Sequence, residues 1–344
     1  MSVASIGYYV HHHGEGHRRR AMAIAARAPG RLTLIGTGVA GLEGPFQTLE
    51  LPDDRMVGEE AFDGIDAAGE RPAALHYAPV HHEGVRARVR EVAGWIATAR
   101  PALMVVDVSV EIAMLARLCA TPTIYVRLAG ARWDEAHLDA FRGARALIAP
   151  FDRRCDDADV PGWVMDKTRH LPGLGAATGR ARAPGDVVLV AFGRGGAHTT
   201  AQEVSDAARA TPGRRWRVIG PMAESAEPPA NLEVAGWVDR AEDEIARAGV
   251  VVGGAGDGVL SAAAAGARPF VCVAEDRPFG EQRAKARALH EARAAVVLPA
   301  WPDAARWPRI LDEAAALETS RIAGFHDPEG PAKAAALILE QADR

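Results

Sequence analysis

The chain has 344 residues, of which 48% are hydrophobic and 25% charged, a balance typical of a globular protein with buried cores. Its formal net charge is -5 and its longest basic run is only Arg18–Arg20, so the charge pattern does not favour a nucleic-acid partner. The cysteines at positions 119, 155 and 272 lack the spacing of metal ligands or of a disulfide framework, which favours a reducing compartment.

The start of the chain does not resemble a secretory leader, because Met1 runs directly into the short apolar stretch Ile6–Val10. Nowhere do about 18 consecutive apolar residues occur, which argues against a membrane-spanning helix. We therefore expect a cytoplasmic protein. Peripheral association with a membrane surface stays open as a second possibility.

Short apolar segments alternate with amphipathic segments along most of the chain. The first half is expected to contain strands at 6–10, 31–36, 102–107, 123–126 and 146–149, with helices at 18–27, 84–99 and 110–119. Strands that are apolar on both faces, separated by segments of helical length, are typical of a parallel sheet covered on both sides. The chain length and the return of the same pattern further on predict two such Rossmann-like α/β domains.

The segment 161–184 interrupts this pattern with prolines and glycines, and we expect it to be an interdomain linker. The domains would then be residues 1–160 and 185–330, followed by a C-terminal helix within 331–344. The second domain is expected to have strands at 186–192, 215–220, 232–237, 250–253 and 269–274, with helices at 200–210 and 259–265. Because open α/β sheets bind ligands at the carboxyl ends of their strands, we expect two domains facing a ligand cleft.

A run of histidines, glycines and arginines follows the first expected strand. Gly14 and Gly16 allow a tight turn there, and the start of the next helix favours negative charge. His17 is suited to act as a general base, because histidine titrates near neutral pH. A metal site and the absence of any chemical role are the alternatives. Adjacent histidines in a loop rarely converge on one ion, so we expect no metal.

The string from Gly14 to Arg20 resembles the G-x-G-H-x-x-R signature that opens MurG-like (family 28 type) glycosyltransferases of the GT-B architecture. The resemblance implies that His17 is the general base and that Arg20 lies on the first helix, with Gly14 and Gly16, on the acceptor side. The first domain would then be the acceptor-side domain and the second the nucleotide-sugar domain.

A glycine-rich segment far downstream adds to the resemblance. The strand at 250–253 leads into a turn, a helix, a second strand and the sequence R-P-F-G-E-Q, in the order of the family's nucleotide-sugar segment. The resemblance implies that Glu281 and Gln282 bind hydroxyls of the donor sugar. It also implies a cradle for the donor diphosphate, since backbone N–H groups and a helix dipole bind anions. This cradle comprises Gly254, Ala255, Gly256, Asp257 and Gly258.

Three further parts of the chain belong to the same expected donor site. Gly193, Arg194 and Gly195 resemble the loop by which the family approaches the diphosphate, and Arg194 is a natural phosphate partner. Ala262 departs from the family, which has a ribose-binding glutamate at this position; the lost hydrogen bonds are worth about 1.5–3 kcal/mol. Trp237 follows a strand end where the family lines its base pocket, and a core position is the alternative.

On the acceptor side, Asp107 and Ser109 follow the strand at 102–107, with a helix cap as the alternative. The resemblance implies metal-independent, inverting transfer of a sugar from a nucleotide-diphosphate sugar, UDP-linked, to a hydroxyl of an unidentified acceptor, with a lipid-linked acceptor included. No cofactor is expected beyond the nucleotide sugar. Two alternatives stay open: a nucleotide-sugar epimerase or hydrolase, and a non-catalytic nucleotide-sugar-binding homologue, which Ala262 favours.

Overall fold

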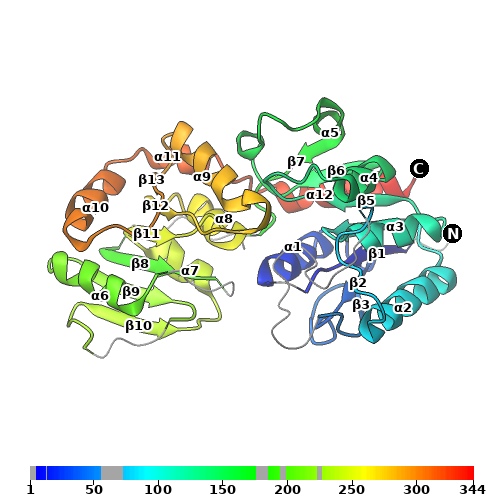
Figure 1. The fold of residues 1–344 in the computed structure, drawn as a ribbon, viewed down its shortest axis with the longest axis horizontal. Helices are drawn as coiled ribbons and strands as arrows, with labels where there is room; N and C mark the ends of the chain where they lie inside the picture. Colours follow the sequence, from blue (N-terminus) through cyan, green and yellow to red (C-terminus); the bar gives the residue numbers. More distant parts are fainter. Residues whose placement is uncertain (1–4, 13, 56–72, 176–184, 194–198, 223–226) are drawn as a thin grey trace. The chain divides into compact units, whose positions relative to one another are not determined.

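The computed structural model describes residues 5–12, 14–55, 73–175, 185–193, 199–222 and 227–344 (Figure 1). The chain divides into two compact units. The first comprises the described residues of Met1–Pro150, Asp157–Leu174 and Glu329–Arg344, and the second those of Phe151–Asp156 and Gly175–Pro328.

The first unit is a seven-stranded, fully parallel sheet in the order β3-β2-β1-β4-β5-β6-β7. Its elements are β1 (Ile6–Tyr9), α1 (Glu15–Ala25), β2 (Leu32–Gly36), β3 (Gln47–Glu50), α2 (Glu83–Ala99), β4 (Leu103–Asp107), α3 (Val110–Leu118), β5 (Thr123–Val126), α4 (Glu135–Gly143), β6 (Ala146–Ala149), α5 (Gly162–Lys167), β7 (Thr168–His170) and α12 (Gly330–Ala342).

Helices cover both faces of this sheet, because β1 and its neighbours present apolar side chains alternately to either side. Tyr8 packs in the cluster formed with α1 and α12. Its neighbour Tyr9 packs on the opposite face, in the cluster formed with α2, α3 and α4. α12 lies against α1 although it ends the chain (Figure 1).

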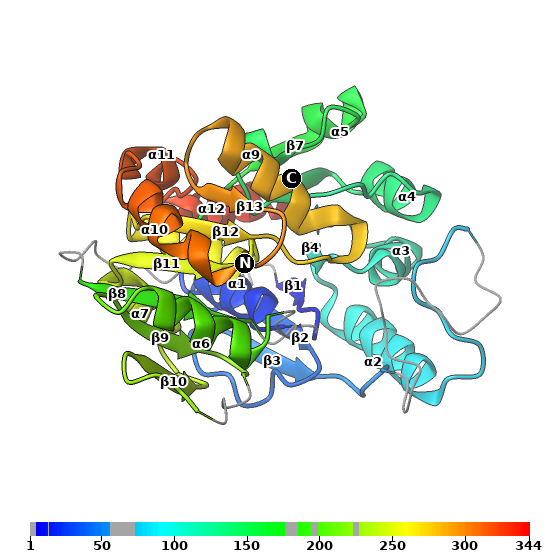
Figure 2. The same cartoon turned by 60° about the vertical axis from the view of Figure 1, so that its left-hand side comes forward.

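The second unit is a six-stranded, fully parallel sheet in the order β10-β9-β8-β11-β12-β13. Its elements are a 3-10 turn η1 (Arg153–Cys155), β8 (Val187–Ala191), α6 (Ala201–Ala210), β9 (Arg215–Ile219), β10 (Leu232–Gly236), α7 (Ala241–Arg247), β11 (Val250–Gly253), α8 (Asp257–Ala265), β12 (Phe270–Val273), η2 (Pro278–Gly280), α9 (Glu281–Glu291), β13 (Val296–Leu298), η3 (Ala304–Arg306), α10 (Trp307–Ala315) and α11 (Thr319–Ala323). α6 and α10 lie side by side over one face of the sheet, where Trp216 and Trp307 pack edge to face (Figure 2).

The predicted fold class, two Rossmann-like units with parallel sheets, is confirmed. The first part of the predicted linker is wrong, because residues 161–174 contain α5 and β7, and β7 pairs with β6. Residues 176–184 lie outside the described part of the chain. Residues 151–156 belong to the second unit, where Arg287 Nη2 donates to Asp156 O at 2.8 Å. The C-terminal helix belongs to the first unit.

Candidate functional site

The strand order reverses at one place in each sheet. In the first unit this place lies between β1 and β4, and open α/β sheets bind ligands at the carboxyl ends of such strands. The loop that follows β1 contains the histidines and leads to His17 on α1, while β4 ends at Asp107. The topology therefore brings together two residues that are 90 positions apart in the sequence.

His17, Asp107 and Arg20 form one charged group at this place. His17 Nδ1 lies 3.0 Å from Asp107 Oδ1, and Arg20 Nε lies 3.2 Å from Asp107 Oδ2. Asp107 is completely buried, Arg20 is buried, and His17 is 9% exposed. Because the charge of Asp107 is buried beside an arginine, their attraction opposes the cost of removing both charges from water.

The contacts of His17 Nδ1 favour different tautomers. The Asp107 carboxylate, at 3.0 Å, favours a proton on Nδ1, whereas Arg20 Nη2, at 3.4 Å, can donate only to an unprotonated Nδ1. With the proton on Nδ1, Nε2 carries the lone pair and can accept a proton. Tyr8 donates its hydroxyl to Asp107 Oδ2 at 3.5 Å, and burial together with the charge of Asp107 raises the pKa of Tyr8 well above 10.

The backbone at the end of β4 is strained in a way that fixes Asp107 and the turn after it. Val108 has φ of 57°, a left-handed conformation that a β-branched residue rarely adopts. Tyr125 holds this turn by donating its hydroxyl to Val108 O at 2.6 Å. Ser109 then caps α3, since its Oγ accepts from Ile112 N at 3.3 Å. The helix-cap alternative for Ser109 is therefore what the structure shows.

Gly14 and Gly16, at the start of α1, differ in whether the backbone favours glycine. Gly14 precedes the helix with φ of 92°, which favours glycine. Gly16 lies in the first turn of the helix, with open space where a Cβ would lie. His13 lies outside the described residues.

A second charged group on the first unit was missed by the sequence analysis. His12 Nδ1 lies 3.3 Å from Asp54 Oδ1, and Arg88 Nη2 lies 2.9 Å from the same oxygen. Arg88 also donates to the Tyr9 hydroxyl at 2.7 Å and to Thr37 Oγ1 at 2.6 Å. Burial raises the pKa of Asp54, although the charge of Arg88 opposes that shift. A sequence signal existed, because Asp54 follows β3 at the same edge of the sheet, but β3 itself had not been predicted.

A cavity of about 70 Å³ opens beside this second group. Its wall includes His11, His12, Tyr9 and Asp54 on one side and Val108 and Ser109 after β4 on another. The His11 ring links the two charged groups, since its centroid lies 4.7 Å from that of His12 and 5.4 Å from that of His17. The cavity is thus a neighbour of the His17–Asp107 pair.

In the second unit the strand order reverses between β8 and β11. β11 runs into the glycine-rich turn, and α8 begins at Asp257 without a side-chain cap on its first N–H groups. An uncapped helix N-terminus after a glycine-rich turn is suited to bind an anion. Gly193, at the end of β8, has open space around its Cα, while Arg194 and Gly195 lie outside the described residues.

The Gln282 side chain stabilises this glycine-rich turn by hydrogen bonds. Its Oε1 accepts hydrogen bonds from Ala255 N and Glu275 N, both at 3.0 Å, and its Nε2 donates to Glu275 Oε2 at 3.1 Å. The side chain is 5% exposed. These bonds tie the turn after β11 to the segment after β12, and the contact of Gln282 with donor-sugar hydroxyls stays a prediction.

Glu281 and Asp257 share a buried cation. Lys285 is 1% exposed, and its Nζ contacts Asp257 Oδ1 and lies 2.6 Å from Glu281 Oε1. Although burial alone lowers it, the two carboxylates raise the pKa of Lys285 above its ordinary value. This cation offsets negative charge at a turn that is expected to bind diphosphate.

Two other expected donor positions have clear surroundings. Ala262 is buried on α8, next to the buried Ser261. Trp237, directly after β10, is 49% exposed, so the core alternative for this residue is wrong. An exposed indole at the carboxyl end of a strand offers a flat surface to a ligand.

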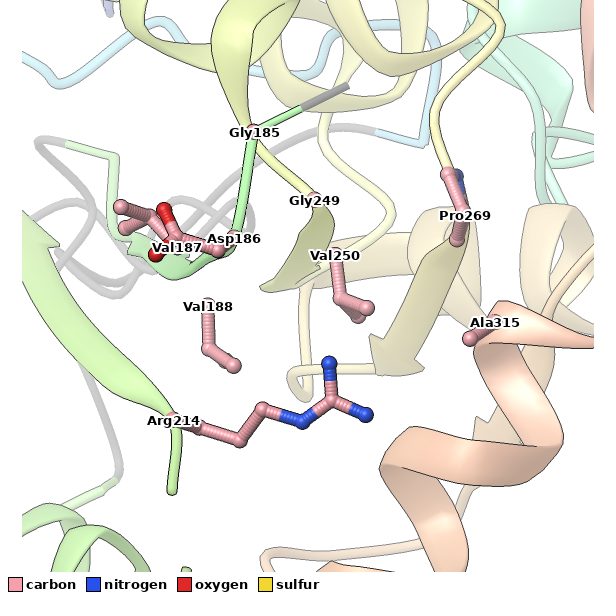
Figure 3. A pocket seen from close by; sticks show the side chains of 9 residues that line it. All are labelled: Gly185, Asp186, Val187, Val188, Arg214, Gly249, Val250, Pro269 and Ala315. Atoms are coloured by element: carbon pink, nitrogen blue, oxygen red, sulfur yellow. The ribbon is translucent and has the colours of Figure 1, made fainter. Parts of the chain in front are cut away.

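A larger cavity, of about 220 Å³, lies at the opposite edge of the second sheet (Figure 3). It is formed by residues at the amino ends of β8 and β11, with Arg214 and Ala315 on its other sides. It contains none of the residues expected at the donor site.

Among the described residues, no helix combines the length and the apolar character needed to cross a membrane. The same residues contain no group of three or more histidine, cysteine or acidic side chains arranged around a common metal position.

Comparison with known proteins identifies the fold. No protein-family model matches the chain, and no curated protein sequence matches it. Solved structures do match over nearly the full length, and they are glycosyltransferases of the GT-B architecture. The glycotransferase of kitacinnamycin has a TM-score of 0.70 at 16% identity, with 98% of each chain covered.

A UDP-glucosyltransferase from Polygonum tinctorium has a TM-score of 0.67 at 14% identity, with 100% of both chains covered. MurG of Acinetobacter baumannii has a TM-score of 0.62 at 13% identity, covering 98% of this chain and 99% of its own. The chain therefore has the GT-B fold, in agreement with the resemblance to MurG-like enzymes found in its sequence.

Proposed function

We propose that this protein transfers a sugar from a nucleotide-diphosphate sugar, UDP-linked, to an acceptor hydroxyl, with inversion and without a metal ion. The observation that carries the proposal is the pairing of His17 with the buried Asp107 at the carboxyl edge of the first sheet. Proteins with the same fold, among them a UDP-glucosyltransferase, support the same activity.

In the proposed reaction, His17 Nε2 takes the proton from the acceptor hydroxyl as its oxygen attacks the anomeric carbon of the sugar. The bond from that carbon to the diphosphate breaks, and the diphosphate leaves with the electron pair. Asp107 stabilises the imidazolium that forms, as a carboxylate does in other histidine-based catalysts. Attack from the side opposite the leaving group inverts the anomeric carbon.

The second unit supplies the donor contacts in this proposal. The uncapped first turn of α8 and the glycine-rich turn before it bind the diphosphate through backbone N–H groups. Preorganised donors of this kind stabilise the developing charge on the leaving group without a metal ion. The exposed Trp237 ring stacks on the nucleobase, and Gly193, Arg194 and Gly195 extend the diphosphate contacts.

A nucleotide-binding protein without transferase activity is the second candidate. Ala262 favours it, because alanine on α8 cannot hold the ribose hydroxyls that a glutamate at this position holds in the family. The His17–Asp107 pair favours the enzyme, since a buried carboxylate beside a histidine is suited to general-base catalysis.

A thermal-shift panel decides first whether a donor binds. UDP, dTDP, GDP, ADP and their sugar conjugates are compared with and without Mg²⁺, because a ligand of the folded state raises apparent stability. A selective shift identifies the donor, and product formation with phenolic and lipid-linked acceptors is then followed by mass spectrometry. If no nucleotide shifts the melting temperature at millimolar concentration, the transferase proposal is wrong.

His17→Ala then tests the base. We expect kcat to fall by about 10²–10⁴-fold while the nucleotide shift is kept. His81→Asn is the matched control, since His81 is exposed with φ of 61°, a conformation that asparagine tolerates. Turnover that survives in His17→Ala would contradict the proposed base.

A further inference from the structure

The first unit contains the same side-chain arrangement twice. In each copy a histidine presents Nδ1 to a buried carboxylate, and a buried arginine contacts that carboxylate: His17–Asp107–Arg20 in one, His12–Asp54–Arg88 in the other. Each copy also includes a tyrosine of β1. These are consecutive residues, which point to opposite faces of the sheet. The proposed reaction uses only the first copy.

The second copy is a neighbour of the first. The His11 ring lies between the two groups, stacked on His12 and tilted toward His17, with the centroid distances given above. His12 and Asp54 also line the cavity beside the first copy. His12 Nδ1 lies 3.3 Å from Asp54 Oδ1, and a carboxylate beside this atom favours the tautomer in which Nε2 accepts a hydrogen bond.

The described charged side chains around the cavity already form ion pairs or accept backbone hydrogen bonds, which argues for an uncharged ligand. Arg88 contacts Asp54, and Arg55 donates from Nε to both carboxylate oxygens of Asp53 at 2.9 Å. The Glu111 carboxylate accepts from the backbone N–H groups of His76 and Tyr77. A charged ligand would lose part of its hydration here, while the described charges named above already have polar partners.

The walls of the cavity favour a flat ring. Aromatic and imidazole rings, among them Tyr9, His12 and Tyr77, form part of the lining, and the branched side chains of Val85 and Ile112 form another part. Such walls suit an aromatic ring, which makes close contact on its faces. A volume of about 70 Å³ is enough for one ring-sized portion of a ligand.

We propose that His12 is a second acceptor-binding residue, which accepts a hydrogen bond from a second hydroxyl of the acceptor. The acceptor class is then an uncharged aromatic molecule with two hydroxyl groups, one at His17 and one at His12. The inference rests on the proposed function, because it takes His17 to bind the hydroxyl that receives the sugar.

Binding measured without any donor tests the inference independently of turnover. Isothermal titration of the full chain compares 2,7-dihydroxynaphthalene with 2-naphthol, for the unmodified protein and for His12→Ala. One neutral hydrogen bond corresponds to about fivefold in affinity, so the diol, which bonds to both histidines, should bind about fivefold more tightly than 2-naphthol, which bonds to one. In His12→Ala the ratio should fall to about twofold or less.

Asp54→Asn keeps the shape of the site and should cause the same loss, because asparagine no longer selects the Nδ1–H tautomer of His12. His81→Asn should leave the ratio unchanged. A ratio of two or less in the unmodified protein, or the same ratio in His12→Ala, overturns the inference. So does tighter binding of 6-hydroxy-2-naphthoate, the matched carboxylate, than of 2-naphthol.

Steady-state kinetics separate this inference from the proposed function. With the donor found in the thermal-shift panel, His12→Ala should raise KM for the diol about fivefold and leave kcat within twofold. For the monohydroxy compound, 2-naphthol, the ratio kcat/KM should not change. If no donor is turned over, the proposed function fails and the titration still decides on His12. If turnover occurs and His12→Ala affects both phenols equally, the inference fails alone.

Discussion

The two units have the same strand order around the point of reversal and differ in what they place there. At the ends of β1 and β4 the first unit has buried ionisable side chains, and His17 and Asp107 are the clearest pair. At the ends of β8 and β11 the second unit has glycines and the start of a helix. Its charged residues nearby, Asp257, Glu281 and Lys285, neutralise one another to a large extent.

This difference agrees with the two kinds of chemistry that the proposed sugar transfer requires. A proton acceptor must be a side chain with a suitable pKa, and it must be held by other side chains. A diphosphate can be bound by backbone N–H groups, which any sequence with enough glycine provides. The same scaffold can therefore carry either task, and only the side chains at the strand ends reveal which task a unit has.

Asp107→Asn is expected to have the largest effect, and it should affect only the chemistry assigned to the first unit. Asparagine cannot stabilise an imidazolium at His17, and its amide can stabilise the wrong tautomer, so kcat should fall by about 10²–10³-fold. The affinity for the nucleotide, measured by thermal shift, should not change. Because Arg20 loses its contact with a buried carboxylate, we also expect a loss of about 3–5 kcal/mol in the free energy of unfolding.

Asp139→Asn is the control, since Asp139 pairs with Arg142 on the exposed face of α4 and such pairs contribute about 0–1 kcal/mol. Full activity in Asp107→Asn, or an equal loss of nucleotide affinity in that variant, would contradict the division of tasks between the units.

Much of the fold could be predicted because buried parallel strands are continuous apolar runs in sequence. The expected strand at 123–126 and that at 250–253 coincide with β5 and β11. The missed strands lack that signal: β3 has the sequence QTLE with mostly exposed side chains, and β7 and β13 have three residues each. These three strands lie at the edges of their sheets, and they form because they pair with the neighbouring strand, which the sequence pattern does not show.

Single residues of the candidate site were predicted from the sequence, but the contacts between them were not. His17 and Asp107 were each expected on the acceptor side, but their contact depends on β1 and β4 being neighbours in the sheet. Asp54 was missed together with β3. Gln282 was expected to bind sugar, and sequence could not show that its amide is used by Ala255 N and Glu275 N.

The second prediction concerns the glycine-rich segment after β11, where two glycines four positions apart should respond with opposite signs. A Cβ on Gly254 would lie 2.6 Å from Gln282 Oε1, so Gly254→Ala must displace the Gln282 side chain. The two backbone N–H groups that it accepts from would then lose their partner, which costs about 2–3 kcal/mol locally. Hydrogen exchange should become faster in peptides that contain Ala255 and Glu275.

Gly258→Ala is the matched comparison. Gly258 lies in α8 with open space around its Cα, and alanine favours a helix over glycine by roughly 0.5–1 kcal/mol. Slower exchange in α8 is therefore expected in this variant. If both substitutions accelerate exchange equally, the turn is not held by Gln282.

The smallest expected effect is a pH dependence of stability in the first unit. His137 is 1% exposed, and its Nδ1 lies 2.6 Å from Asp134 Oδ2. Burial lowers the pKa of His137 below 6.5, although the contact with Asp134 opposes that shift. As the pH falls through 6.5, the unfolded chain therefore binds a proton that the folded chain does not, and the folded state loses stability.

Urea unfolding at pH 7.5, 6.5 and 5.5 measures this loss. His137→Gln keeps a donor for Asp134 and removes the titration, so the stability difference between the unmodified protein and this variant should shift in favour of the variant as the pH falls. Although burial raises it, the hydrogen bond from His137 lowers the pKa of Asp134, so this carboxylate titrates only at more acidic pH and does not contribute in this range. His81→Gln, at an exposed position of the same unit, should follow the unmodified protein at all three pH values. A difference between the unmodified protein and His137→Gln that stays constant with pH would mean that the pKa of His137 is the same in the folded and unfolded states. A shift in favour of the unmodified protein as the pH falls would mean that the ion pair with Asp134 outweighs burial.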